Sequence, residues 1–359
     1  MFLKPITVKK AYVDLITSKI TVWMWNNIFK ECFDILKDKE VMNDDSIIRE
    51  ALMNGVIYYQ DDAFYAKTKF PNKVASELER IGARYVKSRK AYVIAKTKLP
   101  TEIVWAVDTV KARAFAKAMA INQFLLSQLS NMDDLLKKMV FDDAVNAIMK
   151  NLQDRVYANA KAHRIELITP KLDDFMQDEI AKRYTENLDF WIKNWTEDEI
   201  VKMRNDVSQM ANVGKSVKSI AEYIQKEFGI SQRHAKFLAR NESAMATTSY
   251  LAAKYTHEGF VYFKWHAIID GRQRDLHGDK GATGVGGFHE GLNGRIFRFD
   301  DPPIIDIRTG QRGLPGQTYN CRCSFSPYIT KEFLENRRKM FKANNSLIDR
   351  IKQIWKKTA

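Results

Sequence analysis

Two histidines and two cysteines in the last third of the chain are candidate metal ligands. They are His277, His289, Cys321 and Cys323, and Asp275 is an alternative to His289 as the fourth ligand. Thiolate and imidazole together form a ligand set that zinc accepts in proteins. The cysteines are spaced Cys-x-Cys, which is shorter than the usual Cys-x-x-Cys zinc knuckle. Zinc is therefore one candidate cofactor, and no other cofactor is expected.

A catalytic interpretation uses some of the same residues. His277 and His289, together with Asp270 and Arg272, supply the base, acid and cationic stabiliser that a metal-dependent nuclease would need. No serine or cysteine nucleophile motif accompanies them, and no spacing places both histidines on one face. We therefore do not expect an enzyme, and we keep the nuclease as the alternative function.

A structural interpretation is the one that we favour. Asp270 and Arg272 would pair with each other and tie their turn to the segment 321–323. Polar residues that cluster in loops usually satisfy the hydrogen-bonding groups of the backbone around them. On this interpretation the turn and the Cys-Arg-Cys segment lie side by side.

The elements that must position these residues are a helix, a strand and a loop. A helix that ends at Gly259 carries Arg240 and Glu242, each of which we expect to bond to the sheet that follows. The aromatic run 260–265, which ends at Trp265, predicts a strand. The glycine-rich segment 278–287 has no clear strand before it and no clear helix after it, so we expect a mobile insertion.

The rest of the chain predicts an α+β fold. We expect a long, mainly helical N-terminal region that contains a small ββαββ module, followed by a C-terminal domain of mixed α/β structure. Within the long helical region, Asn194 and Trp195 mark an expected break, after which Thr196 and Glu199 form a capping box. Gly229 is expected to stop a further helix and Ser231 to cap the next one. The predicted divisions are 1–53 (helical segment), 54–100 (ββαββ module), 101–210 (helical region), 211–330 (mixed domain) and 331–359 (basic helical tail).

The charge of the chain points to a polyanionic partner. Its 359 residues carry a formal net charge of +14, which favours contact with nucleic acid or with an acidic protein surface. Residues 331–359 contain nine Lys or Arg against three acidic residues, interleaved with apolar side chains as in an amphipathic helix. The candidate contacts to DNA phosphates, or to a partner, are Arg337, Arg338, Lys339, Lys342, Arg350, Lys352, Lys356 and Lys357.

The cysteine count and the hydropathy limit the cellular environments that we expect for this chain. Three cysteines cannot form a disulfide framework, which indicates synthesis in a reducing cytoplasm. The sequence contains no uninterrupted apolar run long enough to cross a bilayer, so we expect a soluble protein or a part of a soluble assembly, with no membrane partner.

The order of the C-terminal motifs resembles the phage Mu F-like family of minor head (head morphogenesis) proteins, over roughly residues 211–328. In this chain Asn241 and Gln273 stand where members of the family commonly have threonine, and relatives that look like zinc binders carry paired cysteines in the Asp-x-Arg turn. The residues that match the motifs of the family are Arg240, Glu242, Trp265, Asp270, Arg272, His277, Asn320, Cys321, Arg322 and Cys323.

The resemblance implies a structural protein of the virion rather than an enzyme. It implies a minor capsid protein of a tailed bacteriophage, made in the host cytoplasm and located in the head near the portal vertex. The expected partners are the portal protein and other head components, with several copies in each particle. Non-specific contact with DNA is expected from the basic tail.

Overall fold

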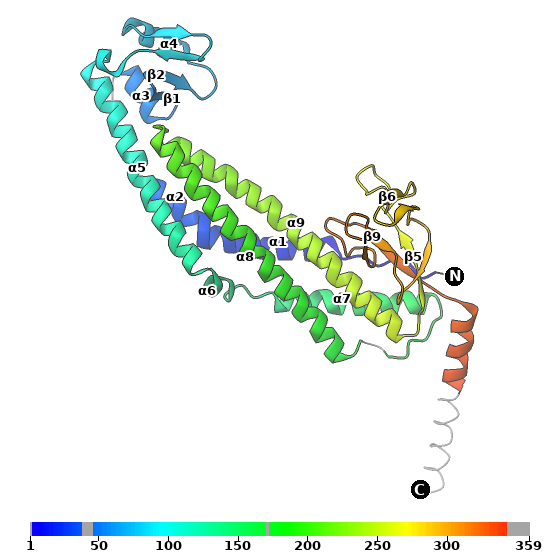
Figure 1. Ribbon diagram of the computed structural model, residues 1–359. Helices are drawn as coiled ribbons and strands as arrows, with labels where there is room; N and C mark the ends of the chain where they lie inside the picture. The colour runs from blue at the N-terminus through cyan, green and yellow to red at the C-terminus, as the bar shows by residue number, and fades with distance from the viewer. Residues whose placement is uncertain (1, 38–45, 170–171, 343–359) are drawn as a thin grey trace, which may run out of the picture. The chain divides into compact units, whose positions relative to one another are not determined.

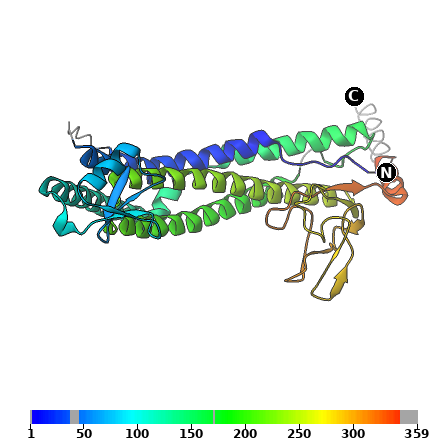
Figure 2. The ribbon, with the colours of Figure 1, turned by 90° about the horizontal axis from the view of Figure 1, so that it is seen from above.

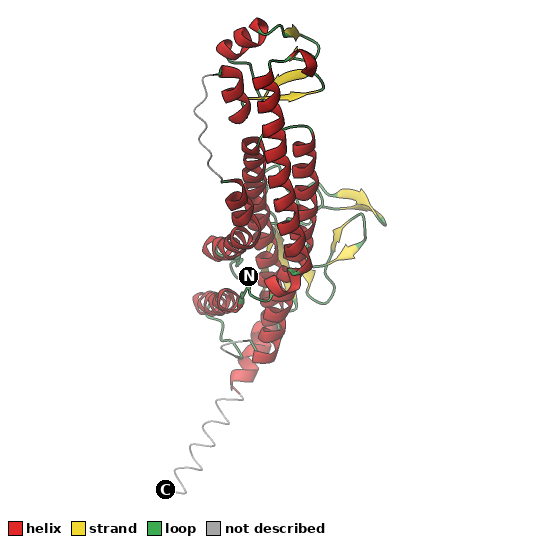
Figure 3. Cartoon of the chain, turned by 90° about the vertical axis from the view of Figure 1, so that its left-hand side faces the viewer, coloured by secondary structure: helices red, strands yellow, loops and turns green. Residues whose placement is uncertain are grey.

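The structure, a computed structural model, describes residues 2–37, 46–169 and 172–342. The chain forms two compact units, and neither is one continuous segment. Unit 1 comprises residues 1–17, 140–188 and 236–359, and unit 2 comprises residues 18–139 and 189–235. Helices predominate, and the strands gather in small sheets (Figure 3). The predicted α+β class is confirmed.

Helices account for most of the described chain. Three of them, α1, α8 and α9, contain residues of both units. The helices are α1 (Lys10–Met24), a π-helical turn (Trp25–Phe29), α2 (Lys30–Leu36), α3 (Ile47–Met53), α4 (Asn72–Arg80), a 3₁₀ turn (Lys96–Lys98), α5 (Thr101–Ser130), α6 (Met132–Leu136), α7 (Asp142–Ala162), α8 (Asp174–Asn212) and α9 (Val217–His257).

Unit 2 contains the ββαββ arrangement that the sequence predicts. Strands β1 (Ile57–Gln60) and β2 (Ala63–Ala66) form one hairpin, and β3 (Arg84–Val86) and β4 (Ala91–Val93) form another, with α4 between them. The four strands make one antiparallel sheet in the order β1-β2-β4-β3. Gly82, at φ +91°, ends α4 in a conformation that suits glycine.

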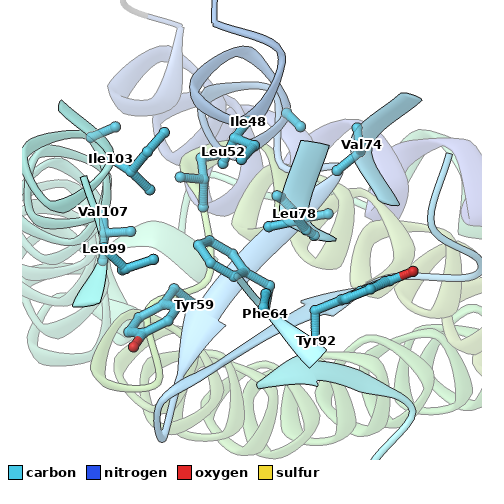
Figure 4. Packing of buried hydrophobic residues seen from close by; sticks show 14 of the residues in the cluster. Ile48, Leu52, Tyr59, Phe64, Val74, Leu78, Tyr92, Leu99, Ile103 and Val107 are labelled. Carbon is cyan, nitrogen blue, oxygen red and sulfur yellow. The ribbon is translucent and has the colours of Figure 1, made fainter. Parts of the chain in front are cut away.

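One face of this sheet packs on helices to form a hydrophobic core (Figure 4). Tyr59 and Phe64 from the sheet, Leu78 from α4 and Ile103 from α5 are all buried in it. The Tyr59 hydroxyl donates a hydrogen bond of 2.7 Å to the carbonyl oxygen of Ile94, so its polar end is satisfied within the core.

The expected breaks in the long helices are absent. Helix α8 runs through Asn194 and Trp195, and Thr196 is fully buried within it instead of capping a new helix. Helix α9 likewise runs through Gly229 and Ser231. One glycine costs a helix roughly 1 kcal/mol, which is less than the gain from burying the apolar faces on both sides of it. The buried residues of these faces include Ile220, Ile224, Ala235 and Ala239.

The strands of unit 1 lie beside the C-terminal half of α9 and project to one side of it (Figures 1 and 2). Strand β5 (Tyr262–His266) is the middle of a three-stranded antiparallel sheet, between β11 (Ser324–Tyr328) and β8 (Ile296–Arg298). Strand β9 (Ile304–Asp306) pairs with β10 (Gln311–Arg312). Trp265 of β5, as predicted, lies in a strand and is fully buried.

The glycine-rich segment, which we expect to be a mobile insertion, contains most of a hairpin. Strand β6 (Ala282–Gly284) pairs with β7 (Gly287–His289). A side chain at Gly284 would meet Ile307 at 2.4 Å, and one at Gly291 would meet the carbonyl oxygen of Gly278 at 2.4 Å. Glycine is needed here because backbones pack directly against their neighbours.

The first part of the basic tail, residues 331–342, is helical and packs against the residues that connect α9 to β5 within unit 1. The Phe333 ring stacks on Phe260 with centroids 4.3 Å apart. Arg337 is 7% exposed and binds both the carboxylate and the carbonyl oxygen of Glu258. This corrects the expectation that Arg337 contacts DNA, because its guanidinium is already engaged inside the protein.

The other basic residues of the tail divide into two groups. Arg338, Lys339 and Lys342 are exposed. The predicted contacts Arg350, Lys352, Lys356 and Lys357 lie outside the described residues. Across the described part of the chain, none of the helices is both long enough and apolar enough to cross a membrane.

Candidate metal centre

His277, Cys321 and Cys323 come together although 44 residues separate the histidine from the first cysteine. The His277 Nδ1 lies 3.5 Å from the Cys321 Sγ and 3.8 Å from the Cys323 Sγ. All three possible ligand atoms lie within 4.8 Å of one another. His277 and Cys321 are buried and Cys323 is partly buried, so these three residues form the cluster that we call the His-Cys-Cys cluster.

The expected fourth ligands do not join this cluster. The His289 Nε2 lies 2.7 Å from the carbonyl oxygen of Val285, within the β6–β7 hairpin, and Asp275 is exposed. Among the described residues, the His-Cys-Cys cluster is the one group of three or more His, Cys, Asp or Glu with metal-binding spacing. The sequence proposal of His289 or Asp275 as a ligand is thereby corrected.

The ring of His277 is held in one orientation. Its Nε2 lies 2.8 Å from the carbonyl oxygen of Ile305, which can only accept a hydrogen bond, so Nε2 carries the proton. The Nδ1 therefore presents its lone pair to the two sulfur atoms. Trp265 packs edge-on against the imidazole, with ring centroids 5.3 Å apart, and closes the apolar side of the cluster.

The proximity of the two thiols changes the pKa of each. A hydrogen bond from the Cys323 thiol lowers the pKa of Cys321 to about 4, although burial opposes this shift. The same interaction with Cys321, together with burial, raises the pKa of Cys323. The interaction between the two thiols therefore shifts their pKa values in opposite directions.

A salt bridge ties the turn to the Cys-Arg-Cys segment. The Asp270 carboxylate accepts two hydrogen bonds from the Arg322 guanidinium, at 2.6 and 2.7 Å. Arg272 donates to the same carboxylate at 2.7 Å. Bonds from Arg322 and then from Arg272 hold the pKa of Asp270 well below its usual range. The expected pair of Asp270 and Arg272 is thus present, and Arg322 completes it.

Arg274 provides a further connection that the sequence did not predict. Its guanidinium donates to the Thr318 hydroxyl at 2.9 Å and to the Tyr319 carbonyl oxygen at 2.7 Å. Arg274 stands between Arg272 and His277 in the charged turn, and this position is the sequence feature that could have predicted the contact. The turn 270–277 therefore contacts the segment 318–323 at three places along its length.

Helix α9 holds the other side of the same segment. Arg240 donates to the Asn320 side-chain oxygen at 2.6 Å, and the Asn241 side-chain oxygen accepts from the Asn320 backbone N–H at 2.9 Å. Asn320 has φ +58°, a left-handed conformation that asparagine tolerates better than most residues. The segment therefore turns sharply just before Cys321.

Glu242 does not bond to the sheet as expected. It is buried, and its carboxylate accepts a hydrogen bond of 2.9 Å from the Asn241 side chain. Burial raises the pKa of Glu242, and hydrogen bonds from Asn241 and from Asn187 of α8 oppose the shift. Glu242 thus connects two helices of unit 1, while Arg240 and Asn241 connect the helix to the segment beside the cluster.

Comparison with known proteins places this geometry in a family. Residues 201–326 match the family model described as "Phage Mu protein F like protein". This part of the chain belongs to the phage Mu protein F-like family. The matched range includes the His-Cys-Cys cluster, the three contacts between the turn 270–277 and the segment 318–323, and the α9 residues that hold Asn320.

One similar protein is from Haemophilus influenzae (strain ATCC 51907 / DSM 11121 / KW20 / Rd) and is named an uncharacterized protein. It is 27% identical over 128 residues, which make up 36% of this chain and 25% of the relative. The chain thus spans about a quarter of the length of that relative. No solved structure matches the chain.

Proposed function

We propose that this chain is a minor head protein of a tailed bacteriophage that takes part in head morphogenesis. The observation that carries the proposal is the family match over residues 201–326. The motif residues support a structural role, because they are engaged with one another: Asp270 with Arg322, Arg240 with Asn320, and His277 with the two cysteines. Such a network stabilises a surface that assembles with other subunits.

We also propose that the protein is located near the portal vertex in several copies, with the portal protein and other head components as partners. The family match supports association with the head. The location near the portal vertex and the contact with the portal protein are proposals that go beyond this match. Excess positive charge supports an additional, sequence-independent contact with packaged DNA. In the described part of the tail, Arg338, Lys339 and Lys342 have the exposure that phosphate contact requires.

Particle composition tests the proposal directly. Particles of the phage that encodes this chain would be purified on a density gradient, and their proteins quantified by mass spectrometry. We expect a few copies for each portal ring, and we expect co-expressed portal protein to co-purify with the chain. Absence from intact particles, with normal heads after deletion of the gene, would reject the proposal.

The alternative, a metal-dependent nuclease, has weaker support. His277 is 2% exposed, and its two nitrogens face the Ile305 carbonyl oxygen and the thiols. A general base must reach the proton that it removes, and this imidazole is occupied. Incubation of the purified protein with supercoiled plasmid and Mg²⁺, Mn²⁺ or Zn²⁺ separates the two functions. Nicking that is lost in His277→Ala would favour the nuclease.

A further inference from the structure

We propose that His277, Cys321 and Cys323 bind one zinc ion through three protein ligands, with the fourth position taken by water. This inference does not depend on the role in the phage head, because it rests on the distances and surroundings of the three ligand atoms.

The spacing of the ligand atoms is that of a tetrahedral zinc site. Zinc binds thiolate at about 2.3 Å and imidazole at about 2.0–2.1 Å, so the tetrahedral angle separates the nitrogen and sulfur ligands by about 3.5 Å. The observed separations between the His277 Nδ1 and the two Sγ atoms are 3.5 and 3.8 Å. A zinc ion therefore fits between the three atoms with little movement of the side chains.

The surroundings prepare the histidine for metal binding. Histidines that bind zinc usually donate their other N–H to a carboxylate or a backbone carbonyl group, which fixes the tautomer. The Ile305 carbonyl oxygen has this role for His277, at 2.8 Å from Nε2. Without such a partner, either ring nitrogen could carry the proton and the ring could rotate. This contact therefore leaves Nδ1 available as a ligand.

The cysteines are also held in place before any metal binds. The backbone turns at Asn320, which Arg240 and Asn241 hold from α9. Arg322, which lies between the cysteines in the sequence, is anchored to Asp270. Both thiols thus remain beside the imidazole.

The fourth position faces a small hollow. A cavity of about 130 Å³ is lined by the three cluster residues and by Arg274 and Tyr319, among others. The described residues place no fourth His, Cys, Asp or Glu within ligand spacing of the cluster. A cavity of this size has room for a water molecule, and three protein ligands plus water is an established arrangement for zinc. Two thiolates balance the charge of the ion.

Metal analysis of the full-length chain tests the proposal. The protein would be expressed with zinc in the medium, passed through a desalting column and analysed for metal content. We expect about one zinc per chain. Replacement of zinc by Co²⁺ should give the thiolate-to-cobalt charge-transfer band and the intense visible bands of tetrahedral cobalt. A zinc content below about one tenth of an equivalent, together with no cobalt spectrum, would overturn the proposal.

Matched variants identify the ligands. His277→Ala, Cys321→Ser and Cys323→Ser should each weaken zinc affinity by more than about 100-fold, since loss of a mere outer-sphere partner already costs 10–100-fold. His289→Ala and Cys32→Ser should retain full zinc content, because His289 bonds elsewhere and Cys32 is buried in unit 2. Retained zinc in all three ligand variants would overturn the assignment.

Thiol labelling of the wild-type chain gives a second measurement that survives misfolding of a variant. Zinc should protect Cys321 and Cys323 from alkylation, and a chelator should expose both, with Cys32 as the internal reference. Equal labelling with and without the chelator contradicts bound zinc. A Cys321–Cys323 disulfide in protein purified without reductant, detected by mass spectrometry, would also overturn the proposal.

Discussion

The guanidinium of Arg322 donates two hydrogen bonds to the carboxylate of Asp270, at 2.6 and 2.7 Å, across 52 residues of sequence. Only a planar fork makes such a bidentate contact, so lysine cannot replace arginine here. This contact is one of the three that hold the 270–277 turn against the segment 318–323.

Replacing the Arg322 guanidinium should weaken the connection between the turn 270–277 and the Cys-Arg-Cys segment. We expect Arg322→Lys to increase the rate of proteolytic cleavage in segments 267–281 and 313–323 several-fold, measured by limited proteolysis with mass spectrometry. Arg298→Lys is the matched control, because Arg298 makes a similar two-bond contact with Asp300, only two residues away. Equal effects of the two variants would show that the long-range connection is unimportant.

Acid should have the same effect as the substitution. The Arg322 guanidinium lowers the pKa of Asp270 in the folded chain below its usual value of 3.8. A group with a lowered folded pKa contributes stability that is present above the unfolded pKa and is lost as pH falls through the folded value. Proteolysis of Asp270→Asn should therefore differ from wild type at neutral pH and converge with it in strong acid.

Two neighbouring arginines of the tail helix should respond differently to substitution. Arg337 is paired with the fully buried Glu258, which also binds the buried Lys254, whereas Arg338 is exposed. Removing one partner of a buried ionic network costs about 3–5 kcal/mol, because a charge is left uncompensated. We expect Arg337→Met to lower the free energy of unfolding of unit 1 by this amount and Arg338→Met to leave it unchanged, both measured by urea titration. A neutral Arg337→Met would contradict the buried network.

The exposed basic residues should account for part of any DNA affinity. Converting Arg338, Lys339 and Lys342 together to alanine should weaken binding to random-sequence duplex DNA. It should also reduce the slope of log affinity against log salt by up to about 3, since each phosphate contact contributes about 0.9.

The control for DNA binding removes the same charge from unit 2. Lys69, Lys73 and Lys87 are exposed residues of the ββαββ module, and their triple alanine variant should bind DNA as the wild type does. Equal losses in both triple variants would indicate a general effect of net charge, and no loss in the tail variant would remove the tail from the interface.

A buried glutamate in unit 2 should make stability depend on pH. Burial raises the pKa of Glu199 from 4.5 to about 7, with a further contribution from Glu227, while Lys202 opposes the shift. An acid with a raised folded pKa binds its proton more tightly in the folded state. Stability is therefore highest below the unfolded pKa and falls as pH rises from about 4.5 to about 7.

Glu199→Gln mimics the protonated side chain and should remove this loss. At pH 8 we expect a gain of about 1–3 kcal/mol in the free energy of unfolding, and almost none at pH 4.5. Glu102→Gln, at an exposed position of α5, is the control and should change neither value. Urea titrations at the two pH values provide the measurement. Destabilisation by Glu199→Gln at pH 8 would contradict the raised pKa.

Short-range patterns in the sequence were sufficient for the ββαββ module and for the strand of Trp265. In the module, two hairpins and one helix use contacts between residues close in sequence, so alternating apolar residues and Gly82 identify them. Long-range packing overrode the local signals at Thr196 and Gly229. A buried helical face outweighs one capping box or one glycine, and this burial is invisible in a local window.

The sequence by itself determined the α+β class, the membership of the C-terminal part in a known family and the tie between Asp270 and the Cys-Arg-Cys segment. Tertiary structure decided which side chains of each type meet. His277 joins Cys321 and Cys323 while His289 bonds within its own hairpin, and Arg337 is buried while Arg338 is exposed. The reason is that residue type sets what a side chain can bind, whereas the distance to its partner depends on how segments far apart in the chain pack.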